Sequence, residues 1–328
     1  MSGPPRTFAV VPVHNGAAVL PETLRAVLAQ SAPPAGVVVV DDGSTDESAG
    51  VAASFAGGPV PVTVIRQANA GESRARNVGV AAAREAGADW VAFCDADDVW
   101  EPHKLERQHA ALAAAPADVA CVYSDFDFLL GPPGAAERRP ADPLPERHAD
   151  PDPHVSMLLG WSVLPSTAVV RADLAQAVGF PEWLRDGEDY IFFLELRGRG
   201  PFVKVPEPLT LYRRTPGQQT AAPGHRTRQV AGLLTWLEKN EGRYAEEQLA
   251  RVRSELAARV AAAHGDAVWA RDLAEVRRCR ALHARLLPGG PKPAAMARPL
   301  APRWVYRMKD GVDAVRGKLT TASAGGAA

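Results

Sequence analysis

The sequence predicts an α/β protein with a largely parallel sheet, helices on both faces of that sheet and a helical C-terminal extension. Within the first 100 residues, a short apolar run, a polar tip and a helical segment follow one another four times. Such alternation is typical of parallel strands joined by crossover helices. From about residue 225, apolar residues recur at helical spacing among many Arg and Glu residues.

The expected strands of the first half are residues 7–13, 37–40, 60–65 and 90–94. Pro12 lies inside the first run, and because proline cannot donate to the ladder we expect the chain to be leaving the sheet there. Pro21 marks the start of a helix. Ser44 and Glu47 have the spacing of a capping box that would begin the next helix.

The second half is less regular. Residues 131–153 are rich in proline and charged residues, and we expect a mobile loop or lid there. The other elements expected here are helices at 104–115, 172–178 and 191–196, regular structure at 164–171, and strands at 119–123, 202–205 and 209–213.

Three carboxylates end the fourth apolar run: Asp95, Asp97 and Asp98. In an extended segment Asp95 and Asp97 point to one side and Asp98 to the other. Two carboxylates on one side repel each other unless a divalent cation or a set of donors lies between them. The sequence therefore favours a metal site with oxygen ligands suited to Mg²⁺ or Mn²⁺, the alternative being a solvated turn.

Arg74 and Arg76 lie in the first turns of the helix that follows residues 69–71, where they oppose the helix dipole. A helix N-terminus with an Arg is a phosphate site, so this segment is a candidate anion site. The alternative is a solvated Arg face paired with Glu72 or Glu85.

Ligands of open parallel sheets bind beyond the carboxyl ends of the strands. Three polar tips of this chain are expected to converge there, which is stronger support for a site than any one motif. They are His14 with Asn15, Asp41 with Asp42, and residues 95–98.

Four ordered motifs resemble those of family 2 glycosyltransferases, whose GT-A fold has a Rossmann-like sheet. They are Val-Pro-Val-His-Asn at 11–15, Asp-Asp-Gly-Ser-Thr-Asp at 41–46, Asn-Ala-Gly-Glu-Ser-Arg-Ala-Arg-Asn-Val-Gly at 69–79 and Asp-Ala-Asp-Asp at 95–98. The resemblance covers roughly the first 215 residues. It implies an inverting transfer of sugar from a UDP-, GDP- or dTDP-linked donor to an acceptor hydroxyl, with a divalent metal on the diphosphate. His14 departs from the family, where Tyr is more usual.

The resemblance also implies roles for particular residues. Asp97 would bind the metal, with Asp95 and Asp98 as further ligands, and Asp95 would also lie near the donor sugar. Asp189 would be the general base and Glu188 its alternate, whereas a structural interpretation makes Asp186 an N-cap before two first-turn carboxylates. The candidate donor-binding residues are Pro12, His14, Asn15, Asp41, Asp42, Arg74, Asn77, Asp95 and Ala96.

We expect three regions along the chain. Residues 1–220 would form the catalytic domain, with a nucleotide-binding half (1–100) and an acceptor half (101–220). Residues 221–290 would be helical, and residues 291–328 would form a basic and then disordered tail. The basic segment 298–318 is a candidate contact with an anionic membrane surface, the alternative being a solvated tail.

Composition limits the classes of partner. The formal net charge of -1 gives no support for nucleic-acid binding. The three cysteines form no CxxC pair, and the N-terminus lacks a signal pattern, so we expect a cytoplasmic protein, with peripheral contact to the inner face of the membrane as an extension. The acceptor stays open among a glycan, a lipid carrier, a protein and a natural product, and a homo-oligomer is compatible with the helical region.

Other nucleotide-binding classes fit less well. The first strand is followed by Val-His-Asn-Gly-Ala-Ala, not by the GxGxxG of a dinucleotide-binding dehydrogenase. The Gly-rich phosphate loop of a nucleotidyltransferase is also missing after that strand. A nucleotidyltransferase of similar architecture and a non-catalytic nucleotide-sugar-binding protein are the two alternatives to a glycosyltransferase.

Overall fold

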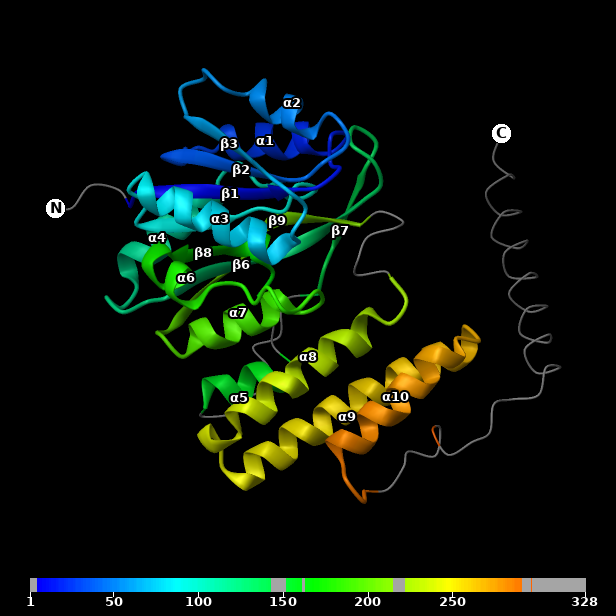
Figure 1. The fold of residues 1–328 in the computed structure, drawn as a ribbon. Coiled ribbons are helices and arrows are strands. Elements are labelled where there is room, and N and C mark those ends of the chain that lie inside the picture. The colour runs from blue at the N-terminus through cyan, green and yellow to red at the C-terminus, as the bar shows by residue number, and fades with distance from the viewer. Residues whose placement is uncertain (1–4, 143–151, 161–162, 215–221, 291–295, 297–328) are drawn as a thin grey trace, which may run out of the picture. The chain divides into compact units, whose positions relative to one another are not determined.

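The computed structural model describes residues 5–142, 152–160, 163–214, 222–290 and 296 (Figure 1). The chain forms two compact units. The first consists of residues 1–222 with 235–239, and the second of residues 223–234 with 240–328.

The first unit begins with four parallel strands in the spatial order β3-β2-β1-β4. Every residue of β1 and β2 is buried, which is why these strands are continuous apolar runs in the sequence. The prediction of a parallel sheet in this half is confirmed. The strands are β1 (Thr7–Val13), β2 (Gly36–Asp42), β3 (Val62–Gln67) and β4 (Trp90–Phe93).

Helices cover both faces of these strands, as expected. Leu20 and Leu24 of α1 (Leu20–Leu28) pack in one cluster with Val11 of β1. On the other face α3 (Glu72–Glu85) lies so close to the sheet that a Cβ at Gly79 would be 2.4 Å from Val10 Cγ1. The short helix α2 (Ser48–Ala53) connects β2 to β3.

The sheet continues beyond β4 in the order β8-β6-β9-β5. Strand β8 is antiparallel to both β4 and β6, whereas β6 and β9 are parallel, so the sheet is mixed. The strands are β5 (Val99–Trp100), β6 (Cys121–Leu130), β8 (Ala168–Arg171) and β9 (Phe202–Arg214), and the helices are α4 (Lys104–Ala114), α5 (Pro153–Leu158), α6 (Ala172–Val178) and α7 (Glu188–Arg197).

Two local predictions about the N-terminal half are wrong. Strand β1 continues through Pro12, which pairs with Val40 of β2. It can do so because the pairing of β1 with β4 ends at Val10, so no second ladder needs the missing donor. The capping box at Ser44 is absent, because the Ser44 Oγ instead accepts the Asn15 N–H (2.9 Å).

Two predictions about the acceptor half are also corrected. The expected lid at 131–153 contains a strand, β7 (Glu137–Pro140), which pairs antiparallel with β6, while residues 143–151 lie outside the described residues. Arg138 of β7 pairs with Asp127 (2.7 Å), which ties the segment down. The two strands expected at 202–213 are one strand, because a register shift opposite Asp125 accommodates the Pro-Glu-Pro sequence.

The second unit is helical, as the sequence predicts. Helices α9 (Glu246–Trp269) and α10 (Leu273–Leu286) pack side by side through buried apolar faces (Figure 1). Helix α8 (His225–Asn240) contributes to both units. Across the described part of the chain, no helix is both long enough and apolar enough to cross a membrane. The segment 298–318 lies outside the described residues.

Candidate active site

The three polar tips meet at the carboxyl edge of the sheet. His14 Nδ1 lies 2.8 Å from the carbonyl oxygen of Asp42. Asn15, whose φ of 53° is in the left-handed region, accepts the Thr45 N–H (2.8 Å) on its side-chain oxygen. The loops after β1 and β2 are therefore joined by side chains that the sequence singles out.

Asp41 and Asp42 hold these loops in place. The Asp41 carboxylate is fully buried and accepts hydrogen bonds from Ser44 N (2.9 Å) and Arg66 Nε (3.0 Å). Asp42 accepts hydrogen bonds from the backbone of Ala70 and Gly71, both at 2.8 Å. Their predicted role in donor binding stays a prediction, and the structure adds a role in fixing the 43–44 and 69–71 loops.

Arg74 and Asn77 contact the loop before α7. Arg74 Nη1 donates to Glu182 Oε2 (3.3 Å). Asn77 Nδ2 donates to the Phe180 carbonyl (2.9 Å), and Asn77 Oδ1 accepts the Phe180 N–H (2.7 Å). These contacts attach the 180–182 loop to α3, and the donor-binding role predicted for the two residues stays a prediction.

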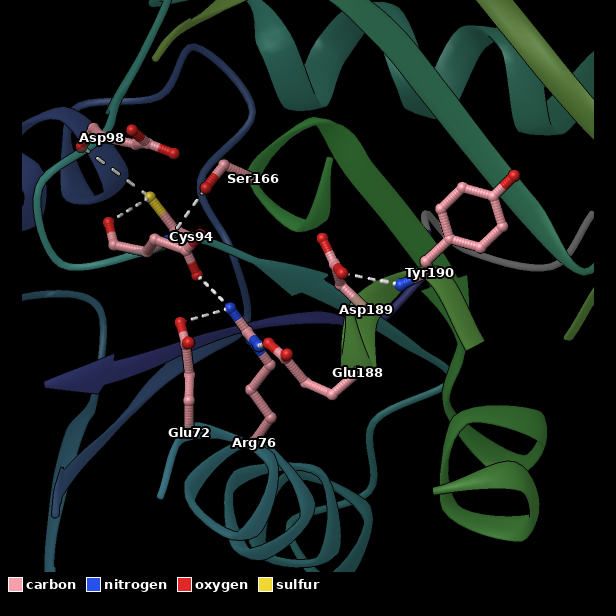
Figure 2. Close-up of polar contacts among 9 residues, drawn as sticks. Glu72, Arg76, Cys94, Asp98, Ser166, Glu188, Asp189 and Tyr190 are labelled. Carbon is pink, nitrogen blue, oxygen red and sulfur yellow. Dashed lines mark hydrogen bonds and ion pairs between the residues drawn. The ribbon is translucent and has the colours of Figure 1, made fainter. Parts of the chain in front are cut away.

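Arg76 is the central cation of the site. From the sequence it belongs to the candidate anion segment, but it is not one of the candidate donor-binding residues. Its side chain is 2% exposed. Nη2 donates to Glu72 Oε1 (2.6 Å) and Asp95 Oδ1 (2.8 Å), and Nη1 donates to Glu188 Oε1 (3.2 Å). In Figure 2 the guanidinium lies between Glu72 and Glu188. One buried arginine thus joins the acidic loop after β4 to the start of α7.

The Glu188–Asp189 pair lies in the first turn of α7, and the two carboxylates have different surroundings. Glu188 is buried against Arg76, whereas Asp189 is partly exposed and accepts the Tyr190 N–H (2.7 Å). Burial raises the pKa of Glu188 to about 7 and that of Asp189 to about 6, while Arg76 acts in the opposite direction on both. Both carboxyls therefore bind a proton more readily than an ordinary Asp or Glu.

The alternative interpretation of this segment as a helix cap is not supported at Asp186. The N-cap of α7 is Gly187, which has a φ of 83° and no side-chain cap bond. Asp186 is buried instead. The first-turn position of the two acidic residues after it is as expected.

The acidic loop after β4 is held from two sides. The Asp95 N–H donates to Ser166 Oγ (2.9 Å). Arg213 of β9, which is fully buried, donates through Nε to the Asp97 carbonyl (2.8 Å), and its backbone N–H donates to Asp98 Oδ1 (2.9 Å). Arg213 also donates to Glu22 Oε2 of α1 (2.5 Å). This second contact holds the guanidinium in the position from which it supports the acidic loop.

A protein-family model described as glycosyl transferase family 2 matches residues 8–139 of the chain. The match places residues 8–139 in glycosyl transferase family 2. A Nostoc sp. protein called an uncharacterized glycosyltransferase is 43% identical over 37% of each chain. The succinoglycan biosynthesis protein ExoW of Rhizobium meliloti is 31% identical over 54% of this chain and 58% of its own. A Haemophilus influenzae uncharacterized glycosyltransferase is 30% identical over 61% of this chain and 66% of its own. The chain thus spans about a third to two thirds of the length of these relatives.

Solved structures confirm the GT-A fold. S. aureus TarS 1-349, solved in complex with UDP-GlcNAc, superposes with a TM-score of 0.54 at 17% identity over 86% of this chain and 89% of TarS. The mannosyltransferase PcManGT of Pyrobaculum calidifontis, solved with GDP-Man and Mn²⁺, gives a TM-score of 0.54 at 20% identity over 89% of this chain and 77% of its own. At these identities the likeness concerns the fold of the family 2 chain.

The residues of the family 2 site fit a divalent metal only in part. Among the described residues, no three His, Cys, Asp or Glu side chains form a group that could hold a metal ion. Asp98 is buried with Oδ1 bound to Arg213, and burial raises the pKa of its carboxyl. Asp95 and Asp97 are partly exposed, and Asp95 Oδ1 is paired with Arg76. This arrangement suits a cation that takes most of its ligands from a diphosphate.

Proposed function

We propose that the chain transfers a sugar from a nucleotide-diphosphate donor to an acceptor hydroxyl, with inversion at the anomeric carbon. The observation that carries the proposal is the position of Arg76 between Asp95 and Glu188. Asp95 belongs to the motif that binds the donor in the resembling family, and Glu188 adjoins the candidate base. The guanidinium therefore places the donor loop beside the base.

In this mechanism Asp189 takes the proton from the acceptor hydroxyl as that oxygen attacks the sugar. Two features favour Asp189 over Glu188: it is partly exposed, and its carboxylate makes no ion pair with Arg76. Glu188, buried on Arg76, is the positioning residue. It holds the start of α7 against α3.

Asp97, with Asp95 beside it, would hold the divalent metal together with the donor's diphosphate oxygens. Mg²⁺ or Mn²⁺ bound there would neutralise the charge that develops on the departing diphosphate. The UDP-GlcNAc of TarS and the GDP-Man and Mn²⁺ of PcManGT support a nucleotide sugar and a divalent cation as ligands. They leave open which nucleotide base and which sugar this chain's donor carries.

The test is an assay of the products released from UDP-, GDP- and dTDP-linked sugars with Mn²⁺ or Mg²⁺. A glycosyltransferase releases a nucleoside diphosphate and transfers the sugar, which NMR of the product would show with inverted configuration. A nucleotidyltransferase releases pyrophosphate. Donor-dependent thermal stabilisation without any product would favour the non-catalytic alternative.

A further inference from the structure

Trp183 is an exposed aromatic side chain in the loop that precedes the catalytic helix α7. It is 54% exposed, and of the three large hydrophobic side chains that are strongly exposed in the described residues it is the one in the first unit. Lys239, which belongs to the same unit, places its Nζ 5.3 Å from the centre of the Trp183 ring. The ring therefore has a cation on one side and remains more than half exposed.

The loop that carries Trp183 is held firmly on α3. Ser73 Oγ donates to the Pro181 carbonyl (3.1 Å), and the Leu184 N–H closes a turn on the same carbonyl oxygen (3.3 Å). Glu182, next to Trp183, accepts from both Arg74 (3.3 Å) and Asn77 (3.1 Å). The loop is thus ordered before any ligand binds, so binding at Trp183 does not have to order it.

The same stretch of α3 holds both this loop and the catalytic pair. Ser73, Arg74 and Asn77 anchor residues 180–182, while Arg76 between them binds Glu188. Trp183 and Asp189 are therefore attached to one rigid element, at the two ends of a short connection. The backbone that carries Trp183 is therefore attached through α3 to the start of α7.

We propose that Trp183 is an acceptor subsite that stacks against a sugar ring of a glycan acceptor. The proposal rests on the proposed glycosyl transfer, because it concerns the acceptor of that reaction. The C–H face of a pyranose is weakly positive and apolar, and it complements the electron-rich face of an indole. Glu182, exposed beside Trp183, accepts from Arg74 and Asn77, and its carboxylate oxygens have further lone pairs that can accept from sugar hydroxyls.

The experiment compares the full-length wild type with Trp183→Ala and Trp183→Phe. Trp269→Phe is the matched control, since Trp269 is 50% exposed but lies in the second unit. The probes are methyl glycosides and unsubstituted disaccharides of glucose, galactose, mannose and N-acetylglucosamine. Two quantities are measured: the change in tryptophan fluorescence on adding each saccharide, and nucleoside-diphosphate release with and without it.

We expect at least one saccharide to change the fluorescence of the wild type and of Trp269→Phe, but not that of Trp183→Phe. Trp183→Ala should raise the KM for that saccharide about tenfold or more. Slow donor hydrolysis without acceptor should stay within about twofold of the wild type, because Trp183 lies outside the acidic loop after β4 that carries the candidate metal and donor residues. Trp183→Phe should retain part of the affinity.

Three results would overturn the subsite. One is a saccharide-stimulated release that Trp183→Ala leaves unchanged. Another is intact donor turnover with no fluorescence or rate response to any saccharide in the wild type. The third is a blue shift of Trp183 fluorescence on anionic phospholipid vesicles without a saccharide response, which would assign the ring to a membrane surface. Failure of the proposed function gives a different result, because then neither the wild type nor any of the variants would release nucleoside diphosphate.

Discussion

Arg76 Nη2 lies 2.8 Å from Asp95 Oδ1, which joins helix α3 to the loop after β4. The same guanidinium contacts Glu188, so two acidic motifs far apart in the sequence share one counter-ion. A buried guanidinium with several carboxylate partners keeps its charge, and here its pKa is raised despite burial. The contact therefore makes Arg76 the residue on which the geometry of the site most depends.

Replacing Arg76 with Met is expected to lower the free energy of unfolding by about 3 kcal/mol, because it leaves buried Glu188 without its counter-ion. Transfer should fall strongly with it. Arg74→Met is the matched control, since Arg74 lies two residues away and its pair with Glu182 is exposed on both sides. That change should cost about 0 to 1 kcal/mol. Urea unfolding measures both, and equal losses would contradict the assignment.

Replacing Asp189 with Asn should lower kcat by about 10² to 10⁴ while nucleotide binding persists, because the change removes the base and keeps the shape of the side chain. Steady-state kinetics and nucleotide-induced thermal shifts measure the two effects. Glu188→Gln is the comparison. We expect it to retain more transfer, since it keeps a hydrogen-bonding group beside Arg76. A larger loss in Glu188→Gln than in Asp189→Asn would make Glu188 the base.

The pH dependence of kcat/KM should show an acidic limb near pH 6. The base acts when ionised, and the pKa of Asp189 is raised to about 6, so activity should decline as the pH falls through that value. The limb should be absent from the residual activity of Asp189→Asn. An acidic limb near pH 4 in the wild type would show that the pKa of Asp189 is not raised in the working enzyme.

The raised pKa values also make the stability of the fold depend on pH, in the direction opposite to that of activity: the contribution to stability falls as the pH rises. A carboxyl whose pKa is higher in the folded state binds its proton more tightly there, so its contribution to stability is full at low pH. For Glu188 that contribution is lost as the pH rises from its ordinary value of 4.5 through about 7. Glu188→Gln should therefore gain stability relative to wild type over this interval, measured by urea unfolding at pH 5 and pH 8.

Arg213→Met should weaken metal-dependent nucleotide binding, because Arg213 supports the Asp97 carbonyl and the Asp98 carboxylate. A ligand at a hundred times its Kd stabilises the native state by about 2.7 kcal/mol, so the loss is measurable as a smaller thermal shift with UDP or GDP and Mn²⁺. Arg214→Met is the control, since Arg214 is exposed. An unchanged shift in Arg213→Met would remove its positioning role.

Asp97→Ala should abolish the part of the nucleotide-induced thermal shift that EDTA removes. Asp97 is partly exposed, and its carboxylate is the candidate metal ligand of the acidic loop. Asp89→Ala, a change of an exposed aspartate before β4, is the control and should keep the full shift. A metal-dependent shift that survives in Asp97→Ala would place the cation elsewhere.

The sequence by itself determined the elements whose signal is local. Buried parallel strands are continuous apolar runs, so β1, β2 and β4 and the polar tips that follow them could be located from their residues alone. Four motifs in a fixed order also indicated the family and the candidates Asp95 and Asp97, and the resemblance to that family made Asp189 the candidate base. These features depend on neighbours within a few positions of the chain.

Only the tertiary structure decided which charges meet. Arg74 and Arg76 are both arginines in the first turns of α3. Arg74 is exposed and pairs with Glu182, whereas Arg76 is buried and pairs with Asp95 and Glu188. Likewise Arg213 supports the acidic loop from a strand more than a hundred residues away. Side-chain direction on a packed helix or strand depends on what covers that face, and this is a property of the whole sheet, which no local pattern records.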